Sequence, residues 1–307
     1  MEPVDPFIRH RPRLLALAYR LLGTRADAED VVQDAWLRWN RADQPAIADP
    51  EAWLVTTATR LGIDRLRAAR RRRQVYPGPW LPEPAWIDPG TPATGPDEAA
   101  DPAPGPARAL ERAEDVSLAF LAVLERLGPE ERAAFLLREV FDHDYAAIAA
   151  LLERSEAACR QMVHRARGRV AEARPRFGVD PLHHRRLLEK FMHAARGGDR
   201  EAIQTLLHAD AQLVSDGGGK ALAAIRPLHG AERIARLFWA VARRGDRTVR
   251  WQLGLANGEP AVLRYRSGQL VGITVAASAG GRITALYTVA NPEKLAVTGA
   301  SAGTSWW

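Results

Sequence analysis

The sequence predicts a multidomain protein, with two all-α helical domains, the second a helix-turn-helix, and an α+β domain with a curved antiparallel sheet. Apolar residues recur at helical spacing on both sides of a proline-rich segment. After residue 187, runs of alternating apolar and polar residues replace much of that periodicity. A chain of 307 residues is also too long for one small core. We expect domains at residues 5–74, 111–176 and 185–295, a linker at 75–110, and a tail at 296–307.

Composition narrows the class of protein. With 47% hydrophobic and 26% charged residues and no run of 18 apolar residues, we expect a soluble chain without a membrane partner. The start of the chain is acidic and proline-bearing, unlike a secretory signal. The single cysteine, Cys159, excludes an intramolecular disulfide and a cysteine-based zinc site, and fits the cytoplasm. A net charge of +6 points to a polyanionic partner.

The first domain is expected to hold three helices. An apolar stripe that begins at Phe7 ends at Gly23, and Thr24 can cap the helix that follows. Asp49 can cap the third helix, with Pro50 at its first position. The second helix carries an acidic, amide-bearing face around exposed aromatics, which would repel DNA and therefore suits a protein partner; the alternative is an ordinary capped surface helix. The residues of this face are Asp27, Asp30, Gln33, Asp34 and Trp36.

The third helix is strongly basic. Between Arg60 and Arg73 it has seven arginines against one acid, and like charges at helical spacing repel one another. A phosphate backbone would relieve that repulsion. Aromatic and polar residues share a face with the first of these arginines, a combination that suits unstacked bases. The alternative is a solvated charge run with Trp53 in the core. The candidate nucleic-acid residues are Trp53, Thr56, Thr57, Arg60, Arg65 and Arg67.

A proline-rich linker follows. Residues 75–107 contain ten prolines and five acids but no basic residue, so this stretch is expected to be a semi-rigid spacer and not a domain. Its "WLPEPAW" stretch carries two tryptophans and a leucine, which a pure spacer would not need. We therefore expect this stretch to dock as an extended segment, with a solvated segment as the alternative.

Residues 144–170 fit a helix-turn-helix. Asp144 can cap its first helix and Ser155 its second, while Cys159 falls on the inward side as a small core residue. Arginine and glutamine are side chains that read guanine and adenine edges in the major groove. Helix pairs in other folds can have the same pattern. The candidate DNA-reading residues are Ser155, Arg160, Gln161, His164 and Arg165.

The last domain combines helices at 187–196, 201–207 and 231–243 with a meander of strands. It contains the stretch "VSDGGGK", which at first resembles a phosphate-binding loop. A P-loop has a glycine at the first position and Ser or Thr after the lysine, but Val214 and Ala221 stand there. The nucleotide interpretation therefore fails. We interpret the stretch as a contact loop, in which Lys220 can pair with an acid such as Glu83; a flexible turn between strands is the alternative.

These motifs together resemble one protein family. "DAEDVVQDAWLRW", "PEAWLVTTATRLGIDRLR" and "LGPEERAAFLLREVFDHDYAAIAALLERSEAACRQMVHRAR" are similar to the two conserved domains of extracytoplasmic-function RNA polymerase sigma factors. "WLPEP", "DGGGK" and "NPEKL" resemble the subgroup with a fused C-terminal SnoaL-like domain, a cone with a pocket. Leu61 stands where many members of the family have asparagine, so an amide contact there is not expected.

The resemblance implies a role for each surface. The acidic helix would bind the clamp helices of the polymerase β′ subunit, the third helix would open the −10 element and capture a flipped base, and the helix-turn-helix would read the −35 element. The linker would follow the RNA-exit channel. The SnoaL-like domain would replace a separate anti-sigma factor. Its regulatory contacts would be Trp80, Leu81, Pro82, Glu83, Pro84, Asp216, Gly217, Gly218, Gly219, Lys220, Asn291, Pro292 and Lys294.

Two other functions remain possible at this point. Enzymes share the SnoaL-like fold, but the acid–base candidates here have no spacing typical of catalysis, and fold analogy is a weak argument. We therefore expect no catalysis, no metal and no cofactor, although a small ligand could occupy the cone. A helix-turn-helix regulator with a ligand-binding or catalytic module would leave the acidic helix and the arginine-rich helix unexplained. The acid–base candidates are His208, Asp210, Asp216, His229 and Tyr287.

Overall fold

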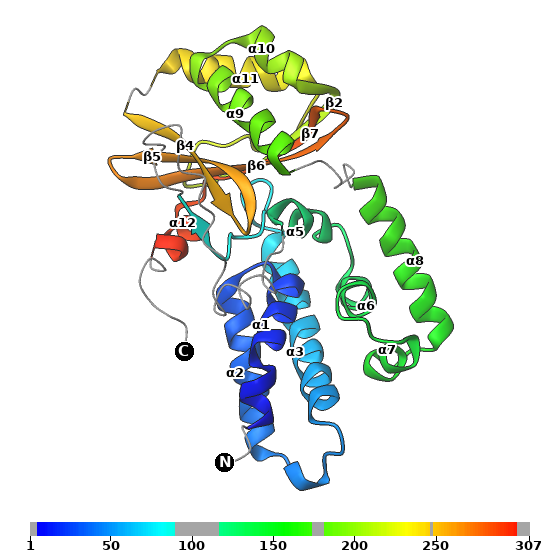
Figure 1. Ribbon diagram of the computed structural model, residues 1–307. Helices are drawn as coiled ribbons and strands as arrows, with labels where there is room; N and C mark the ends of the chain where they lie inside the picture. The colour runs from blue at the N-terminus through cyan, green and yellow to red at the C-terminus, as the bar shows by residue number, and fades with distance from the viewer. Residues whose placement is uncertain (1–4, 90–116, 174–180, 246–247, 300–307) are drawn as a thin grey trace. The chain divides into compact units, whose positions relative to one another are not determined.

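The computed structural model describes residues 5–89, 117–173, 181–245 and 248–299 (Figure 1). The chain forms two compact units, and the division between them falls within one helix, after Ala122. The predicted start of the second domain at 111, most of the linker and the end of the tail lie outside the described residues. The first unit comprises residues 1–75, 105–114 and 123–173, and the second 76–104, 115–122 and 174–307.

The first unit is helical, as expected. Its elements are α1 (Pro6–Leu22), α2 (Arg25–Arg41), the short 3-10 helix η1 (Gln44–Ala46), α3 (Pro50–Arg73), the end of α5 (Leu118–Leu124), α6 (Pro129–Glu139), α7 (Tyr145–Leu152) and α8 (Glu156–Ala173). None of the described helices is both long and apolar enough to cross a membrane.

The helix boundaries of α1 to α3 follow from local signals. The Asp5 carboxylate accepts the N–H of Phe7 at 2.8 Å, and Gly23 ends α1 in the left-handed conformation with φ of 74°. Asp49 caps α3 by accepting the N–H of Ala52 at 3.0 Å. Thr24 occupies the N-cap position of α2 without a side-chain cap, because its hydroxyl donates to Asp27 instead.

The core of these three helices is tightly packed. The apolar stripes of α1, α2 and α3 meet at leucines, valines and the fully buried Trp39. Gly62 lies where α1 and α3 approach each other, and a Cβ there would come within 2.5 Å of the Leu21 side chain. The helical spacing of Trp36 would also allow it to belong to the apolar stripe of α2. Its side chain is 42% exposed, however, so it lies outside this buried stripe.

The helix-turn-helix forms as predicted. Asp144 caps α7 through the N–H of Ala147 at 2.7 Å, and the hydroxyl of Ser155 accepts the N–H of Ala158 at 3.2 Å. Glu153 makes the turn with φ of 55°. The inward side of α8 is buried against α6 and α7, with Cys159 fully buried among its apolar neighbours. Burial raises the pKa of the Cys159 thiol, as expected for a core residue.

The second unit combines helices with one sheet. Its helices are α9 (Pro181–Gly197), α10 (Arg200–Leu206), α11 (Ala231–Arg244) and α12 (Pro292–Gly299). Its strands are β1 (Ile87–Asp88), β2 (Leu207–Asp216), β3 (Leu228–His229), β4 (Val249–Ala256), β5 (Glu259–Arg266), β6 (Gln269–Ala279) and β7 (Arg282–Val289), in the order β1-β4-β5-β6-β7-β2-β3.

The sheet differs from the prediction in one pairing. Strands β4 to β7 form the expected antiparallel meander, but β2 pairs with β7 in parallel. A parallel pair needs a crossover connection, and here the chain between β2 and β7 passes through α11 and the whole meander. Strand β2 is also longer than expected, because it begins at Leu207, where a helix was predicted to end.

The two faces of the sheet carry different cores. Helices α9, α10 and α11 cover one face, with Leu188, Phe191 and Ile234 among its buried residues (Figure 1). The opposite face is covered by segments from distant parts of the chain. Leu81 of the linker, Leu118 of α5 and Leu295 of α12 pack there against the meander strands. The sheet therefore binds part of its own chain on the face that lacks α9 to α11.

Glu259 holds the start of α5 on this second face. Its carboxylate accepts the Ser117 hydroxyl at 2.9 Å and the N–H of Ala119 at 3.2 Å. Burial raises the pKa of Glu259 to about 7, although these hydrogen bonds oppose the shift. Because the raised pKa belongs to the folded state, stability falls as pH rises from the usual glutamate range towards 7.

We therefore expect Glu259→Gln to reduce this pH dependence. Urea unfolding of the full chain at pH 5 and pH 8 measures it as the difference in stability between the two pH values. That difference should be smaller in the variant than in the wild type, since glutamine does not ionise. Equal differences in both proteins would contradict the shifted pKa.

Candidate functional site

The first half of α3 borders a hollow of about 540 Å³ in the first unit. Four of the predicted nucleic-acid residues, Trp53, Thr56, Thr57 and Arg60, line it together. The Trp53 ring lies 5.6 Å from the ring of Trp39, which holds it in place. The remaining lining residues come from α2, from the segment with η1 and from the start of α3: Arg38, Ala46, Ile47, Ala48, Asp49 and Ala52. Arg38 was not predicted, because only the packing of α2 on α3 brings it there.

Arg65 lies elsewhere, with the acidic face of α2. Its guanidinium is 3.4 Å from Asp27, 2.5 Å from Asp30 and 3.3 Å from Asp34. Arg65 was predicted to contact DNA, but the structure pairs it with three carboxylates that were predicted to contact a protein partner. Gln33 and Trp36 of the same face are exposed. The physical reason is helical phase, since Arg65 is five residues beyond Arg60 and so lies on another side of α3.

Two other arginines of α3 pair with acids of the helical segment after residue 123. Arg60 donates to the carbonyl of Leu151 at 3.2 Å and pairs with Glu153 at 3.0 Å. Arg67 pairs with Glu130 at 2.6 Å, besides Asp64 on its own helix. Each of these side chains is partly exposed, so each ion pair is weak by itself.

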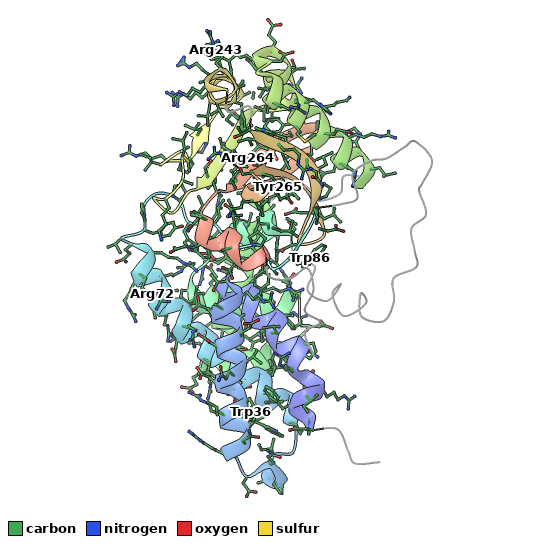
Figure 2. All side chains as sticks on the ribbon, turned by 90° about the vertical axis from the view of Figure 1, so that its left-hand side faces the viewer. Trp36, Arg72, Trp86, Arg243, Arg264 and Tyr265 are labelled. Atoms are coloured by element: carbon green, nitrogen blue, oxygen red, sulfur yellow. The ribbon has the colours of Figure 1, made fainter. Side chains whose placement is uncertain are left out.

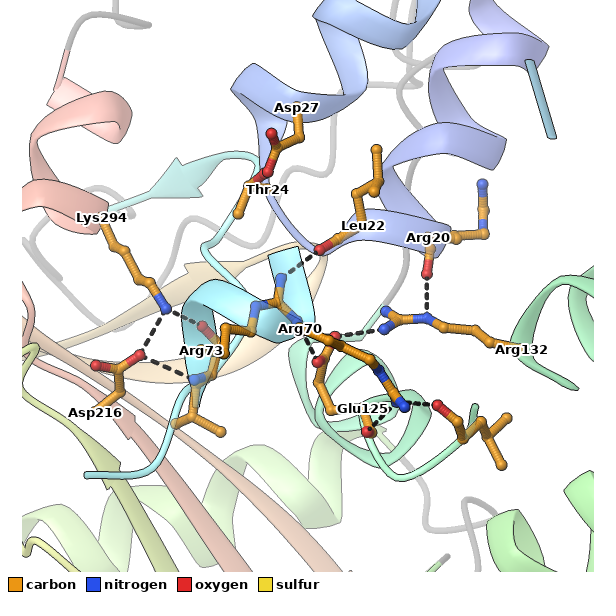
Figure 3. Close-up of polar contacts among 12 residues, drawn as sticks. Arg20, Leu22, Thr24, Asp27, Arg70, Arg73, Glu125, Arg132, Asp216 and Lys294 are labelled. Atoms are coloured by element: carbon orange, nitrogen blue, oxygen red, sulfur yellow. Dashed lines mark hydrogen bonds and ion pairs between the residues drawn. The ribbon is translucent and has the colours of Figure 1, made fainter. Parts of the chain in front are cut away.

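The end of α3 is held more firmly. Glu125 accepts from Arg73 at 2.5 Å and also from Arg132, which is fully buried (Figure 3). Arg73 further donates to the carbonyl of Leu22, and Arg70 donates to the carbonyls of Glu125 and Leu127. Burial lowers the pKa of Arg70 and of Arg73, and the charge of Glu125 opposes that effect. These arginines are structural in this arrangement.

All five predicted residues of the α8 region are exposed. Arg160 pairs with Glu156 one turn earlier at 2.5 Å, and its guanidinium lies 5.3 Å from the centre of the Tyr145 ring. Arg165 is 4.0 Å from Glu131. Ser155 serves as the N-cap, while Gln161 and His164 point away from the buried side. The outward face of α8 therefore presents polar groups of the kind that contact bases and phosphates.

In the second unit, the predicted linker residues and the predicted loop residues meet at Asp216. This carboxylate is fully buried. It accepts the Tyr76 hydroxyl at 2.6 Å and the N–H of Leu81 at 2.9 Å. It also accepts the Lys294 ammonium at 2.6 Å (Figure 3). Lys294 also donates to the carbonyl of Leu81 and lies 4.0 Å from the centre of the Trp80 ring.

Asn291 completes this cluster. Its side-chain amide donates to the Tyr76 hydroxyl at 2.9 Å, and its backbone N–H donates to the Asp216 carbonyl at 3.0 Å. Burial, together with Asp216, raises the pKa of Tyr76, so the phenol remains a hydrogen-bond donor. Pro292 then begins α12, and Pro82, Glu83 and Pro84 are buried beside Leu81.

The three glycines allow close approach of the backbone. Gly218 and Gly219 have φ of 60° and 71°, which other residues rarely adopt. A Cβ on Gly218 would lie 2.4 Å from the Asn291 amide, and one on Gly219 would lie 2.8 Å from Pro77. A Cβ on Gly217 would lie 2.4 Å from the Ala221 carbonyl. The loop therefore needs glycine at each position.

The suggested pairing of Lys220 with Glu83 is wrong. Lys220 forms an ion pair with Glu293 at the start of α12, and both side chains are exposed. The lysine that reaches the linker is Lys294, because α12 places it beside Asp216. Of the acid–base candidates, His208, Asp210 and His229 are exposed, whereas Asp216 and Tyr287 are buried.

Comparisons with known proteins identify the two helical segments of the chain. The model for sigma-70 region 2 matches residues 7–72, and the model for sigma-70 region 4 matches residues 117–170. The chain is 40% identical to the ECF RNA polymerase sigma factor SigJ of Mycobacterium tuberculosis, over 95% of this chain and 92% of SigJ. It is 30% identical to the probable ECF sigma factor SigI of the same species, over 96% and 95%.

A solved structure extends this likeness to three dimensions. The crystal structure of Mycobacterium tuberculosis SigJ matches with a TM-score of 0.72 and 36% identity, over 96% of this chain and 99% of that chain. Regions 2 and 4 define the class of protein, an RNA polymerase sigma factor. More particularly, the chain belongs to the ECF sigma factors, in the subgroup that carries a C-terminal SnoaL-like domain.

Family membership decides between the functions left open by the sequence. Sigma factors are transcription initiation factors and not enzymes, so the expectation of a non-enzymatic protein is confirmed. A helix-turn-helix repressor would have no region 2, whereas this chain has one at residues 7–72. The predicted fold class, with two helical domains and a SnoaL-like cone, is likewise confirmed.

The buried ion pair leads to a prediction about stability. Replacing one partner of such a pair leaves an uncompensated charge or polar group, so Asp216→Asn or Lys294→Met should each cost about 3–5 kcal/mol. Lys220→Met is the matched control, because it removes an exposed pair worth about 1 kcal/mol or less. Urea unfolding of the full chain measures the three variants. A loss for Lys220→Met as large as that for Lys294→Met would contradict this account.

Proposed function

We propose that this chain binds core RNA polymerase and directs promoter-specific initiation by reading the −35 element and melting the −10 element. We further propose that its SnoaL-like domain controls this activity in cis. One observation carries the second part. A buried ion pair of the SnoaL-like domain, Asp216 with Lys294, is hydrogen-bonded to Tyr76 and Leu81 of the linker between regions 2 and 4.

The acidic face of α2 is the proposed polymerase contact. Asp27, Asp30, Gln33, Asp34 and Trp36 would bind the β′ clamp helices, and the β subunit is a further expected partner. Arg65 is better assigned to this surface than to DNA, because it joins three of these carboxylates. By holding them it fixes their orientation, while Trp36 remains exposed as the apolar part of the contact.

The hollow beside α3 is the proposed site for an unstacked base of the −10 element. Trp53 supplies an aromatic surface, Thr56 and Thr57 supply hydroxyls, and Arg60 supplies a cation, which together suit a base and its phosphate. Arg38 adds a second cation from α2. Arg67, further along α3, would contact the backbone and contribute to affinity more than to specificity.

The outward face of α8 is the proposed −35 reader. Arg160 and Gln161 can form the bidentate contacts that distinguish guanine and adenine, and His164 and Arg165 lie on the same exposed side. Ser155 at the N-cap leaves the positive end of the helix dipole free for a phosphate. DNA would compete with Glu156 for Arg160.

Control in cis would act through competition for the same side chains. Arg60 and Arg67 pair with Glu153 and Glu130 of the segment matched to region 4, so these carboxylates occupy positions that promoter phosphates would need. A linker held by Asp216 would favour such an arrangement over an open one, by population shift. No separate anti-sigma factor is then required, and a small ligand could bias the equilibrium. The protein would act in the cytoplasm, with the polymerase.

Run-off transcription with core polymerase and no other sigma factor tests the first part. We expect transcripts from a cognate promoter. Arg160→Ala should weaken promoter binding by about 5- to 150-fold, because a base contact is worth about 1–3 kcal/mol. Arg167→Ala is the matched control, since Arg167 lies on α8 like Arg160 but pairs with Glu139 of α6 and is not assigned to DNA. Background transcription from every variant would exclude sigma activity.

The same assay tests control by the SnoaL-like domain. Asp216→Asn should change the yield of transcripts at equal protein concentration, because it weakens the hold on the linker without touching either DNA-binding surface. Lys220→Met should behave like the wild type. Promoter binding by the variants, measured in parallel, separates a regulatory effect from loss of folded protein. Identical yields from Asp216→Asn and wild type would exclude this route of control.

A further inference from the structure

Arg264 of β5 lies on the face of the sheet that α9, α10 and α11 cover. Val262, two residues earlier on the same strand, belongs to the core under these helices. The residues directly opposite Arg264 are Trp251 on β4 and Gly272 on β6, and Trp251 packs against the same core. Since directly opposite residues of neighbouring strands share a face, the guanidinium points towards the helix-covered side. Figure 2 locates Arg264 and its neighbour Tyr265 on the sheet.

This guanidinium has no counter-ion in the described part of the chain. Its Nε is buried and has no hydrogen-bond partner there, and no described carboxylate forms an ion pair with it. The Trp251 ring, with its centre 5.7 Å away, is its one described interaction of a specific kind. Burial and nearby Arg266 lower the pKa of Arg264 to about 10, so it is still a cation at neutral pH.

Gly272 on the neighbouring strand leaves room for the guanidinium. A Cβ on Gly272 would come within 2.3 Å of Nη2 and 2.8 Å of Cζ, so only glycine leaves room for it against β6. Buried Arg132 of the first unit, by contrast, has acceptors for two of its nitrogens: Nη1 donates to Glu125 and Nε donates to the carbonyl of Arg20. Arg264 lacks acceptors of this kind among the described residues.

Three other polar side chains of the sheet on this face have partners. The hydroxyls of Thr274 and Thr288 are hydrogen-bonded to each other at 2.9 Å, and Ser278 is hydrogen-bonded to His184 of α9 at 2.9 Å. The neighbours on β4 are apolar, with Trp251 and Leu253 packed against the helix-side core. An incoming molecule would therefore meet a cation without a described acceptor beside the apolar side chains of Trp251 and Leu253.

We propose that the helix-covered face of the SnoaL-like sheet binds a small organic carboxylate with an apolar body, and that Arg264 is its anchor. A buried charge is costly unless it is paired, and the planar fork of arginine matches a carboxylate through two parallel hydrogen bonds. Trp251 would pack against the apolar body. This site lies across the sheet from Leu81 and Leu118, so it is separate from the linker contacts.

Thermal unfolding of the full chain with added benzoate or hexanoate tests the proposal, with benzyl alcohol and inorganic phosphate as comparison probes. At about ten times the dissociation constant, one of the two carboxylates should raise the midpoint by about 2–4 °C. Benzyl alcohol, which lacks the charge, and phosphate, which lacks the apolar body, should give smaller shifts. No shift with either carboxylate, or a larger shift with phosphate, would overturn the proposal.

Variants locate the effect. Arg264→Met should abolish the shift and Arg264→Lys, which keeps the charge but not the fork, should reduce it. Arg250→Met is the matched control. Arg250 precedes Trp251 on β4, but it is exposed and its guanidinium lies over the ring of Tyr265 and not beside Arg264. It should keep the full shift. Without ligand, Arg264→Met should unfold at or above the wild-type midpoint. A lower midpoint, or an unchanged carboxylate shift in Arg264→Met, would identify a purely structural arginine.

Discussion

The buried ion pair between Asp216 and Lys294 is the interaction on which the arrangement of the second unit depends. A carboxylate with no exposed surface has to be satisfied on every side, and here its partners come from the linker, from α12 and from its own loop. That requirement explains the glycines beside it, since side chains there would collide with Asn291 and Pro77. It also explains why an otherwise proline-rich spacer contains a tyrosine, a tryptophan and a leucine at this point.

The arginines of the two units differ in whether acceptors surround them. In the helical unit, the arginines of α3 that reach other helices pair with carboxylates or donate to carbonyl groups. Glu125, for example, accepts from two arginines. Those at the end of α3 are held within the fold, while Arg60 and Arg67 keep partners that DNA could replace. In the sheet unit, Arg264 is partly exposed, but its buried Nε has no such acceptor among the described residues. The replaceable partners of Arg60 and Arg67 fit competition with DNA phosphates. The lack of a described acceptor at Arg264 fits binding of an anion.

The two faces of the sheet in the SnoaL-like domain are covered by different parts of the chain. One face is covered by α9, α10 and α11 and packs into a hydrophobic core. The other face binds Leu81 of the linker and Leu118 at the start of the segment matched to region 4. A fold shared with enzymes is thus used for holding chain segments, which illustrates why function has to be argued from the residues on each face.

The sequence by itself determined the local structure and much of the candidate site. Caps at Asp49, Asp144 and Ser155, the inward side of α8 and the docking of "WLPEP" follow from spacing and composition, because capping and periodicity act within a few residues. Only the tertiary structure decided which lysine pairs with Asp216, that Arg65 joins the acidic face, that β2 runs parallel to β7, and that Arg264 has no counter-ion among the described residues. These depend on which distant segments meet, and no spacing within one segment records that.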